Sequence, residues 1–116
     1  MFDDLIQEIW TSTTGLENVL LSGIDGIVIA KHHDSEEDEF LAAESANLIK
    51  EAHRLGEELS SGPLINLFTQ YENHMIIIQT VTPEYYLIGI LSDPKHIGQV
   101  RYRFTLKANE WYSAIA

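Results

Sequence analysis

The chain has 116 residues, of which 45% are apolar and 9% aromatic, a length and composition typical of one domain with a real hydrophobic core. Seven Lys and Arg residues against 18 Asp and Glu give a formal net charge of −11. Because like charges repel, this balance argues against nucleic acid or an anionic membrane as a partner. The chain has no Cys, which excludes disulfides, thiol nucleophiles and thiolate metal sites.

The beginning of the chain, Met1-Phe2-Asp3-Asp4, is acidic and lacks the cationic start of a secretory signal peptide. The longest uninterrupted apolar run spans 75–78, far short of the roughly 20 residues that cross a bilayer. We therefore expect one soluble, cytoplasmic domain covering residues 1–116.

The first half of the chain predicts a helix followed by a hairpin. Apolar residues recur at helical spacing over 2–12. Residues 16–21 and 27–31 are rich in Val, Leu and Ile and are separated by Asp25-Gly26, a turn signal because glycine accepts positive φ at little steric cost.

Residues 36–59 predict a long helix. Ser35 stands three residues before Asp38, close to the pattern of a capping box, and Ser60-Ser61-Gly62-Pro63 ends the helix. One apolar stripe at spacings of three and four predicts the face that packs on the core: Leu41, Ser45, Leu48, Ala52, Leu55 and Leu59.

Three strands, at 64–71, 75–81 and 85–91, follow with short connections and predict an antiparallel meander. Ser92-Asp93-Pro94 begins a last helix, because proline at the first helical position loses no hydrogen bond. The element order is α-β-β-α-β-β-β-α, and we expect an α+β sandwich with a five-stranded antiparallel sheet.

No motif for nucleotide, dinucleotide or metal-dependent hydrolytic chemistry occurs in the sequence, so we expect a protein that is not an enzyme and binds no cofactor. His32-His33-Asp34 is the one metal candidate, but neighbouring strand residues point to opposite faces, which favours a solvated strand end. The acidic side chains of 34–39 are expected to stay in water and complement the helix N-terminus.

A second stripe on the long helix is rich in small residues and favours close packing against a second copy of that helix. Its members are Ala42, Ala46, Ile49, His53 and Gly56. The alternative is that this stripe widens the contact with the sheet. The expected edge strand adds a second surface for homodimer formation, with Leu64, Ile65, Leu67 and Phe68.

Phe40 falls on the polar side of the same helix. It is either an exposed anchor for a partner or a first-turn residue that folds back, and aromatic residues dominate binding energy at interfaces.

The order of several segments resembles the Roadblock / dynein light chain superfamily, in particular its bacterial MglB-like branch. These segments are Leu20-Leu21-Ser22 leading into Asp25-Gly26-Ile27-Val28-Ile29-Ala30, the long helix, the meander, and Leu91-Ser92-Asp93-Pro94 followed by 97–101. The resemblance implies a profilin-like fold and dimers made by pairing third strands and long helices. It also implies binding of a small Ras-like GTPase, stimulation of GTP hydrolysis, and a role in cell polarity or motility.

On this resemblance, the GTPase lies on the outer face of the paired helices. The implied residues are Ala43, Asn47, Lys50 and Arg54, with Phe40 and Ala46 at the margin. Two other functions stay open: a small-molecule sensor of profilin-like shape, and an adaptor for a protein other than a GTPase.

Overall fold

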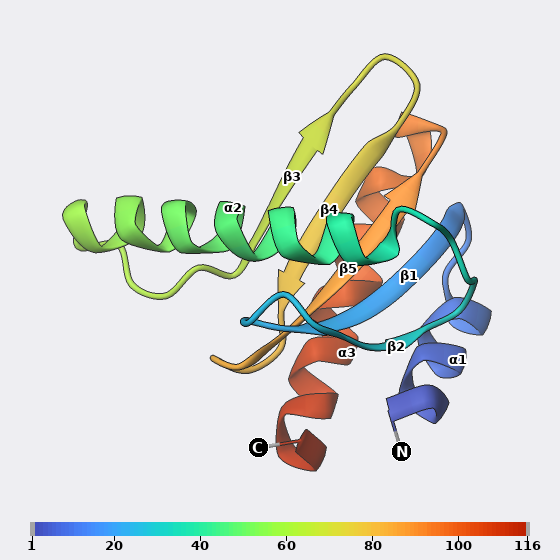
Figure 1. The fold of residues 1–116 in the computed structure, drawn as a ribbon, viewed down its shortest axis with the longest axis horizontal. Coiled ribbons are helices and arrows are strands. Elements are labelled where there is room, and N and C mark those ends of the chain that lie inside the picture. The colour runs from blue at the N-terminus through green and yellow to red at the C-terminus, as the bar shows by residue number, and fades with distance from the viewer. Residues whose placement is uncertain (1, 116) are drawn as a thin grey trace.

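A five-stranded antiparallel sheet separates two helical layers in the computed structural model, which describes residues 2–115 (Figure 1). The helices are α1 (Phe2–Ser12), α2 (Asp38–Glu58) and α3 (Ile97–Ile115), with a 3-10 turn, η1 (Pro94–His96), before α3. The strands are β1 (Leu16–Gly23), β2 (Val28–Lys31), β3 (Asn66–Gln70), β4 (Met75–Thr80) and β5 (Tyr85–Leu91). The predicted element order and fold class are confirmed.

The strand order across the sheet is β2-β1-β5-β4-β3. The β1–β2 hairpin and the β3–β4–β5 meander are both present as predicted, and the two are joined where β1 pairs with β5. The prediction that the third strand is an edge is confirmed, since only β4 pairs with β3 among the residues described.

The face of the sheet that carries α1 and α3 has the larger core, built around Ile77, Leu87 and Phe104. Gly89 of β5 makes room for the Phe104 ring: a Cβ atom at this position would lie 2.7 Å from Phe104 Cζ. The absence of a side chain at Gly89 therefore sets how closely α3 approaches the sheet.

The other face is covered by α2, and here the sequence interpretation needs correction. Ala42, Ala46 and Ile49 are buried against sheet residues such as Ile78 and Ile88. These three members of the small-residue stripe thus pack on the protomer's own sheet, as the alternative held for them. These three residues are not available to a second copy while α2 keeps this position.

The predicted core stripe is right for Leu41 and Ser45, which pack inward, and wrong for Leu48, Leu55 and Leu59, which are exposed. For the last two residues the reason is geometric. Helix α2 has 21 residues and is about 31 Å long at 1.5 Å per residue. Five strands about 4.8 Å apart make a sheet only about 19 Å wide. The C-terminal turns of α2 consequently extend beyond β3 (Figure 1).

Candidate protein-binding site

One exposed stripe of α2 contains all five residues expected to contact a partner protein: Phe40, Ala43, Asn47, Lys50 and Arg54. Phe40 does not fold back, because 69% of its surface is accessible. Arg54 Nη2 lies 2.5 Å from Glu51 Oε2, and this hydrogen bond raises the pKa of Arg54. The guanidinium is therefore charged and held along the helix by a neighbour one turn away.

The Asp25-Gly26 turn lies beside this stripe. Gly26 has φ of +84°, and a Cβ atom there would come within 3.1 Å of Ala43 Cα. The Asp25 carboxylate accepts a hydrogen bond from the main-chain N–H of Ile27 at 3.1 Å, which closes the turn. Small residues at both Gly26 and Ala43 thus allow the hairpin turn to reach the helix.

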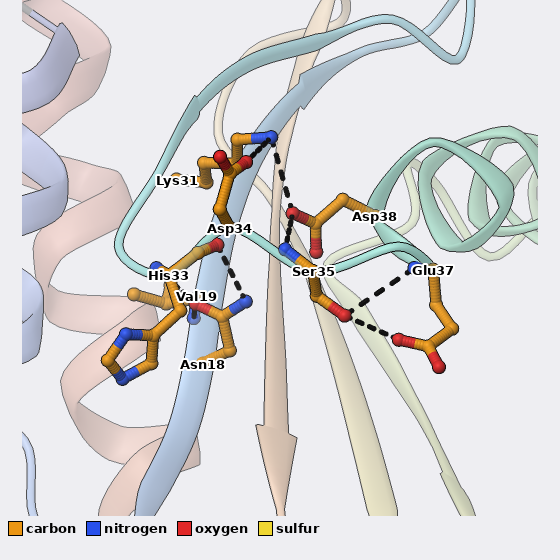
Figure 2. Close-up of polar contacts among 8 residues, drawn as sticks. All are labelled: Asn18, Val19, Lys31, His33, Asp34, Ser35, Glu37 and Asp38. Carbon is orange, nitrogen blue, oxygen red and sulfur yellow. Dashed lines mark hydrogen bonds and ion pairs between the residues drawn. The ribbon is translucent and has the colours of Figure 1, made fainter.

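The segment between β2 and α2 is fixed by a polar network (Figure 2). The Asp38 carboxylate accepts the Ser35 N–H at 2.9 Å and lies 3.4 Å from Lys31 Nζ. Lys31 Nζ also lies 2.5 Å from Asp34, and these carboxylates raise the pKa of Lys31 while Asp34 has its pKa lowered.

Two expectations for this acidic segment are corrected by that network. Asp38 is not solvated, since only 2% of its surface is accessible. The helix begins at Asp38 rather than at residue 36, with Glu37 as its N-cap. The Asp38 carboxylate accepts the Ser35 N–H, as one half of a capping box does, but the N-cap residue Glu37 makes no side-chain capping bond.

Asn18 of β1 ties the same segment to the sheet (Figure 2). Its side-chain oxygen accepts the His33 N–H at 2.9 Å, and its amide nitrogen donates to the His33 carbonyl oxygen at 3.2 Å. Asn18 is buried, so this pair of bonds is protected from competition by water.

His32 and His33 lie beyond the end of β2, so strand alternation does not separate them as expected. Their ring centroids are 4.3 Å apart, and His32 stacks on Trp10 at 3.8 Å. Burial lowers the pKa of His32, with a contribution from His33. His32 Nδ1 is 3.0 Å from Gln7 Oε1. No cluster of three or more metal-ligating side chains occurs within residues 2–115.

The free edge of β3 exposes both side chains and main-chain groups. Ile65 and Phe68 are exposed, whereas Leu64 and Leu67 are half-buried. The Thr80 N–H donates to the Ile65 carbonyl oxygen, and the Tyr71 N–H donates to the His74 carbonyl oxygen. With the register of the two strands, these bonds show that the odd-numbered residues of β3 direct their main-chain groups toward β4. The main-chain groups of Asn66, Phe68 and Gln70 therefore point away from the sheet, available to another strand.

The overhanging turns of α2 form a second apolar surface next to this edge. Leu55 and Leu59 are 61% and 66% exposed. His53, also exposed, lies 2.9 Å from Glu57, and Gly56 is half-buried near the Gly62 carbonyl oxygen. The helical spacing of these leucines predicted a core position, although the length of α2 relative to five strands indicates their exposure. We call Leu55 and Leu59 the overhang surface.

Two grooves flank α2. One, of about 550 Å³, lies beside the β4–β5 connection and is lined mostly by apolar residues together with Lys50 and His53. The other, also of about 550 Å³, lies between the start of α2 and the β3–β4 turn and contains Glu17, Glu37 and Asp38. We call the second one the acidic groove. None of the helices within residues 2–115 has the length and apolar character to cross a membrane.

Comparisons with known proteins agree with this architecture. Residues 2–92 match the family model of the Roadblock/LC7 domain, and α3 lies beyond the matched range. No curated protein matches the sequence.

Solved structures show the same fold at low sequence identity. A Roadblock/LC7 domain from Streptomyces avermitilis has a TM-score of 0.84 at 14% identity, covering 97% of this chain and 96% of that one. Myxococcus xanthus MglB has a TM-score of 0.79 at 18% identity, covering 97% of this chain and 89% of that one. Acanthamoeba castellanii profilin II has a TM-score of 0.72 at 14% identity, covering 98% of each chain. The profilin-like fold is thus confirmed, and the family model shows that the chain belongs to the Roadblock/LC7 domain family.

Proposed function

We propose that this protein is a non-catalytic homodimeric regulator that binds a small Ras-like GTPase and stimulates its GTP hydrolysis. The observation that carries the proposal is the exposed stripe of α2, in which Ala43 and Asn47 are small or short and Lys50 and Arg54 supply positive charge. Small side chains allow a second protein to approach the helix closely. Membership of the Roadblock/LC7 family and the fold shared with MglB support a GTPase as that protein.

The proposed dimer pairs the β3 edges of two protomers about a two-fold axis and covers the overhang surface with the partner's copy. The open main-chain groups of Asn66, Phe68 and Gln70 would hydrogen-bond to the partner's β3 and continue the sheet. The exposed side chain of Leu55 would become buried. Both contacts are isologous, as a two-fold axis requires. Relative to the sequence analysis, two groups of residues remain in the proposed interface: Leu64, Ile65, Leu67 and Phe68 of the edge, and His53 and Gly56 of α2. The overhang leucines replace Ala42, Ala46 and Ile49.

The proposed mechanism is conformational capture of the GTPase. Arg54 lies on a helix rather than on a loop and is held by Glu51 at 2.5 Å, whereas an arginine finger must extend into the partner's phosphate site. Binding that favours the hydrolysis-competent arrangement of the switch segments accelerates turnover without an inserted arginine. The family resemblance would place this activity in cell polarity or motility.

The decisive experiment measures binding and single-turnover GTP hydrolysis with a Ras-like GTPase from the same organism, loaded with GDP or a GTP analogue. The proposal expects tighter binding to the GTP-like state and faster hydrolysis. Asn47→Arg, which places bulk on the stripe, should abolish both, while Tyr102→Arg on the opposite layer should leave both unchanged. Binding of another protein, with no GTPase response, would instead support the adaptor.

The sensor alternative has less support from the described grooves. A small-molecule site buries most of its ligand among convergent polar groups. The groove beside the β4–β5 connection is bordered by the exposed Lys50 and Pro83 and therefore resembles a surface depression.

A further inference from the structure

We propose that the acidic groove binds an arginine-bearing segment of a protein partner. The groove shares only Phe40 with the stripe discussed above, and the inference holds whether or not that partner is a GTPase. The shape, the charge and the rigidity of the groove support this inference.

The shape follows from the way α2 crosses the sheet. Ile90 of β5 and Ile76 of β4 are register partners on the α2 face and are only half-buried. Together with Leu41 they line a cavity of about 550 Å³. An apolar wall of this kind suits the methylene stem of a long side chain, which packs along apolar surface while its charged end stays polar.

The carboxylates of the groove favour a positively charged occupant. Glu17 and Glu37 line the groove, and the Ser35 hydroxyl lowers the pKa of Glu37, which keeps this carboxylate ionised. Asp38 is already engaged by Lys31 and by the Ser35 N–H. Within residues 2–115, Lys and Arg contribute no side chain to the lining. The neighbouring Asp34, Glu36 and Glu39 extend the negative potential outward.

Two exposed aromatic rings favour guanidinium over ammonium. Phe40 and Tyr71 both line the groove and are 69% and 58% exposed. A guanidinium group is planar and weakly hydrated, so it stacks on aromatic rings and also bonds to carboxylates. Exposed aromatics next to acids are thus better matched to arginine than to lysine.

The groove is built before any ligand arrives. Asn18 holds His33 through two hydrogen bonds, and Ser35 bonds to Glu37 (Figure 2). Glu17 also lies 3.4 Å from His74 across the groove. A preformed site loses little conformational entropy on binding.

The test uses a tetra-arginine peptide, acetylated and amidated, titrated into the 15N-labelled protein and followed by NMR. We expect chemical shift changes at Glu17, Ser35, Glu37, Tyr71 and His74. A tetra-citrulline peptide, which keeps the shape without the charge, should produce none of them. A tetra-lysine peptide should bind severalfold more weakly.

Matched variants separate the groove from the overall charge. Glu17→Gln with Glu37→Gln should weaken binding at least about fivefold, the loss expected from removing charge-assisted hydrogen bonds. Glu57→Gln with Glu58→Gln changes the net charge equally on exposed residues of the same helix and should change binding less than twofold. Tyr71→Ala should also weaken binding, and the spectrum of each variant reports whether it folds.

Three results would overturn the inference. These are shift changes located elsewhere on the protein, equal weakening by the two double variants, or tetra-citrulline binding as well as tetra-arginine. None of these measurements involves a GTPase, so their failure is distinct from failure of the proposed function.

Discussion

The Tyr86 hydroxyl of β5 donates a 2.6 Å hydrogen bond to the main-chain carbonyl oxygen of Ala42 in α2. Both residues are buried, and they are 44 positions apart in the sequence. This bond holds the N-terminal half of α2 on the sheet, next to Phe40 and Ala43. It therefore helps to set where the proposed binding stripe stands relative to the β1–β2 turn.

Replacing this tyrosine by phenylalanine removes the bond and keeps the ring. We expect Tyr86→Phe to lower the free energy of unfolding by about 1 kcal/mol, the usual net value of a buried neutral hydrogen bond. Urea denaturation at pH 7 measures it. Tyr112→Phe, at an exposed hydroxyl on α3, is the control and should change stability little.

The same hydroxyl makes the free energy of unfolding depend on pH in the alkaline range. Burial raises the pKa of Tyr86 from 10.0 to about 12, so the folded chain holds this proton more tightly than the unfolded chain. The corresponding stability is present below pH 10 and is lost as the pH rises from 10 to 12. Between these pH values, the Tyr86→Phe variant should lose stability less steeply than the natural sequence in denaturation experiments.

Gly89 is expected to be the most sensitive glycine of the sheet. A methyl group there would meet Phe104 at 2.7 Å and Ile77 at 3.1 Å. Gly89→Ala should therefore cost about 2 kcal/mol through overpacking, measured by urea denaturation. Gly98→Ala is a suitable contrast, because a Cβ atom there would have no neighbour within 4 Å and alanine favours the helix. Equal destabilisation by both would contradict the packing argument.

The proposed dimer predicts that charge on the overhang surface blocks assembly. Leu55→Glu should shift the mass in light scattering from twice 13.2 kDa to that of the protomer, because burying an unpaired carboxylate is costly. Tyr102→Glu introduces the same charge at an exposed site on α3 and should leave the dimer intact. A natural chain that is monomeric at micromolar concentration would remove the basis of this prediction.

Arg54 distinguishes two ways of stimulating a GTPase. Under conformational capture, Arg54→Ala should reduce stimulation severalfold at limiting protein, in proportion to a loss of affinity, and should leave the single-turnover rate at saturating protein nearly unchanged. A loss of roughly 10³-fold at saturation would identify an inserted arginine finger. Glu51→Gln, which frees Arg54 from its neighbour, should leave the saturated rate unchanged under capture.

The local patterns of the sequence predicted the elements, the hairpin, the meander and the β3 edge, because strand alternation, Asp25-Gly26 and Pro94 act within a few residues. They did not predict which stripe of α2 faces the sheet. Both stripes have helical spacing, so spacing alone does not show that Ala46 faces the sheet. Leu55 is exposed because α2 is longer than the sheet is wide. The contact between His32 and His33 was missed for a similar reason, since β2 ends at Lys31 and alternation stops there.

The last turns of α2 gain no stabilisation from the sheet that they extend beyond. Helix propensity alone holds short helical segments weakly in water, so the main-chain hydrogen bonds around Leu55 should be among the first to open. Their amide hydrogen exchange then becomes a direct gauge of occupancy: a twin or any other protein lying over those leucines would slow it, and dilution would restore it.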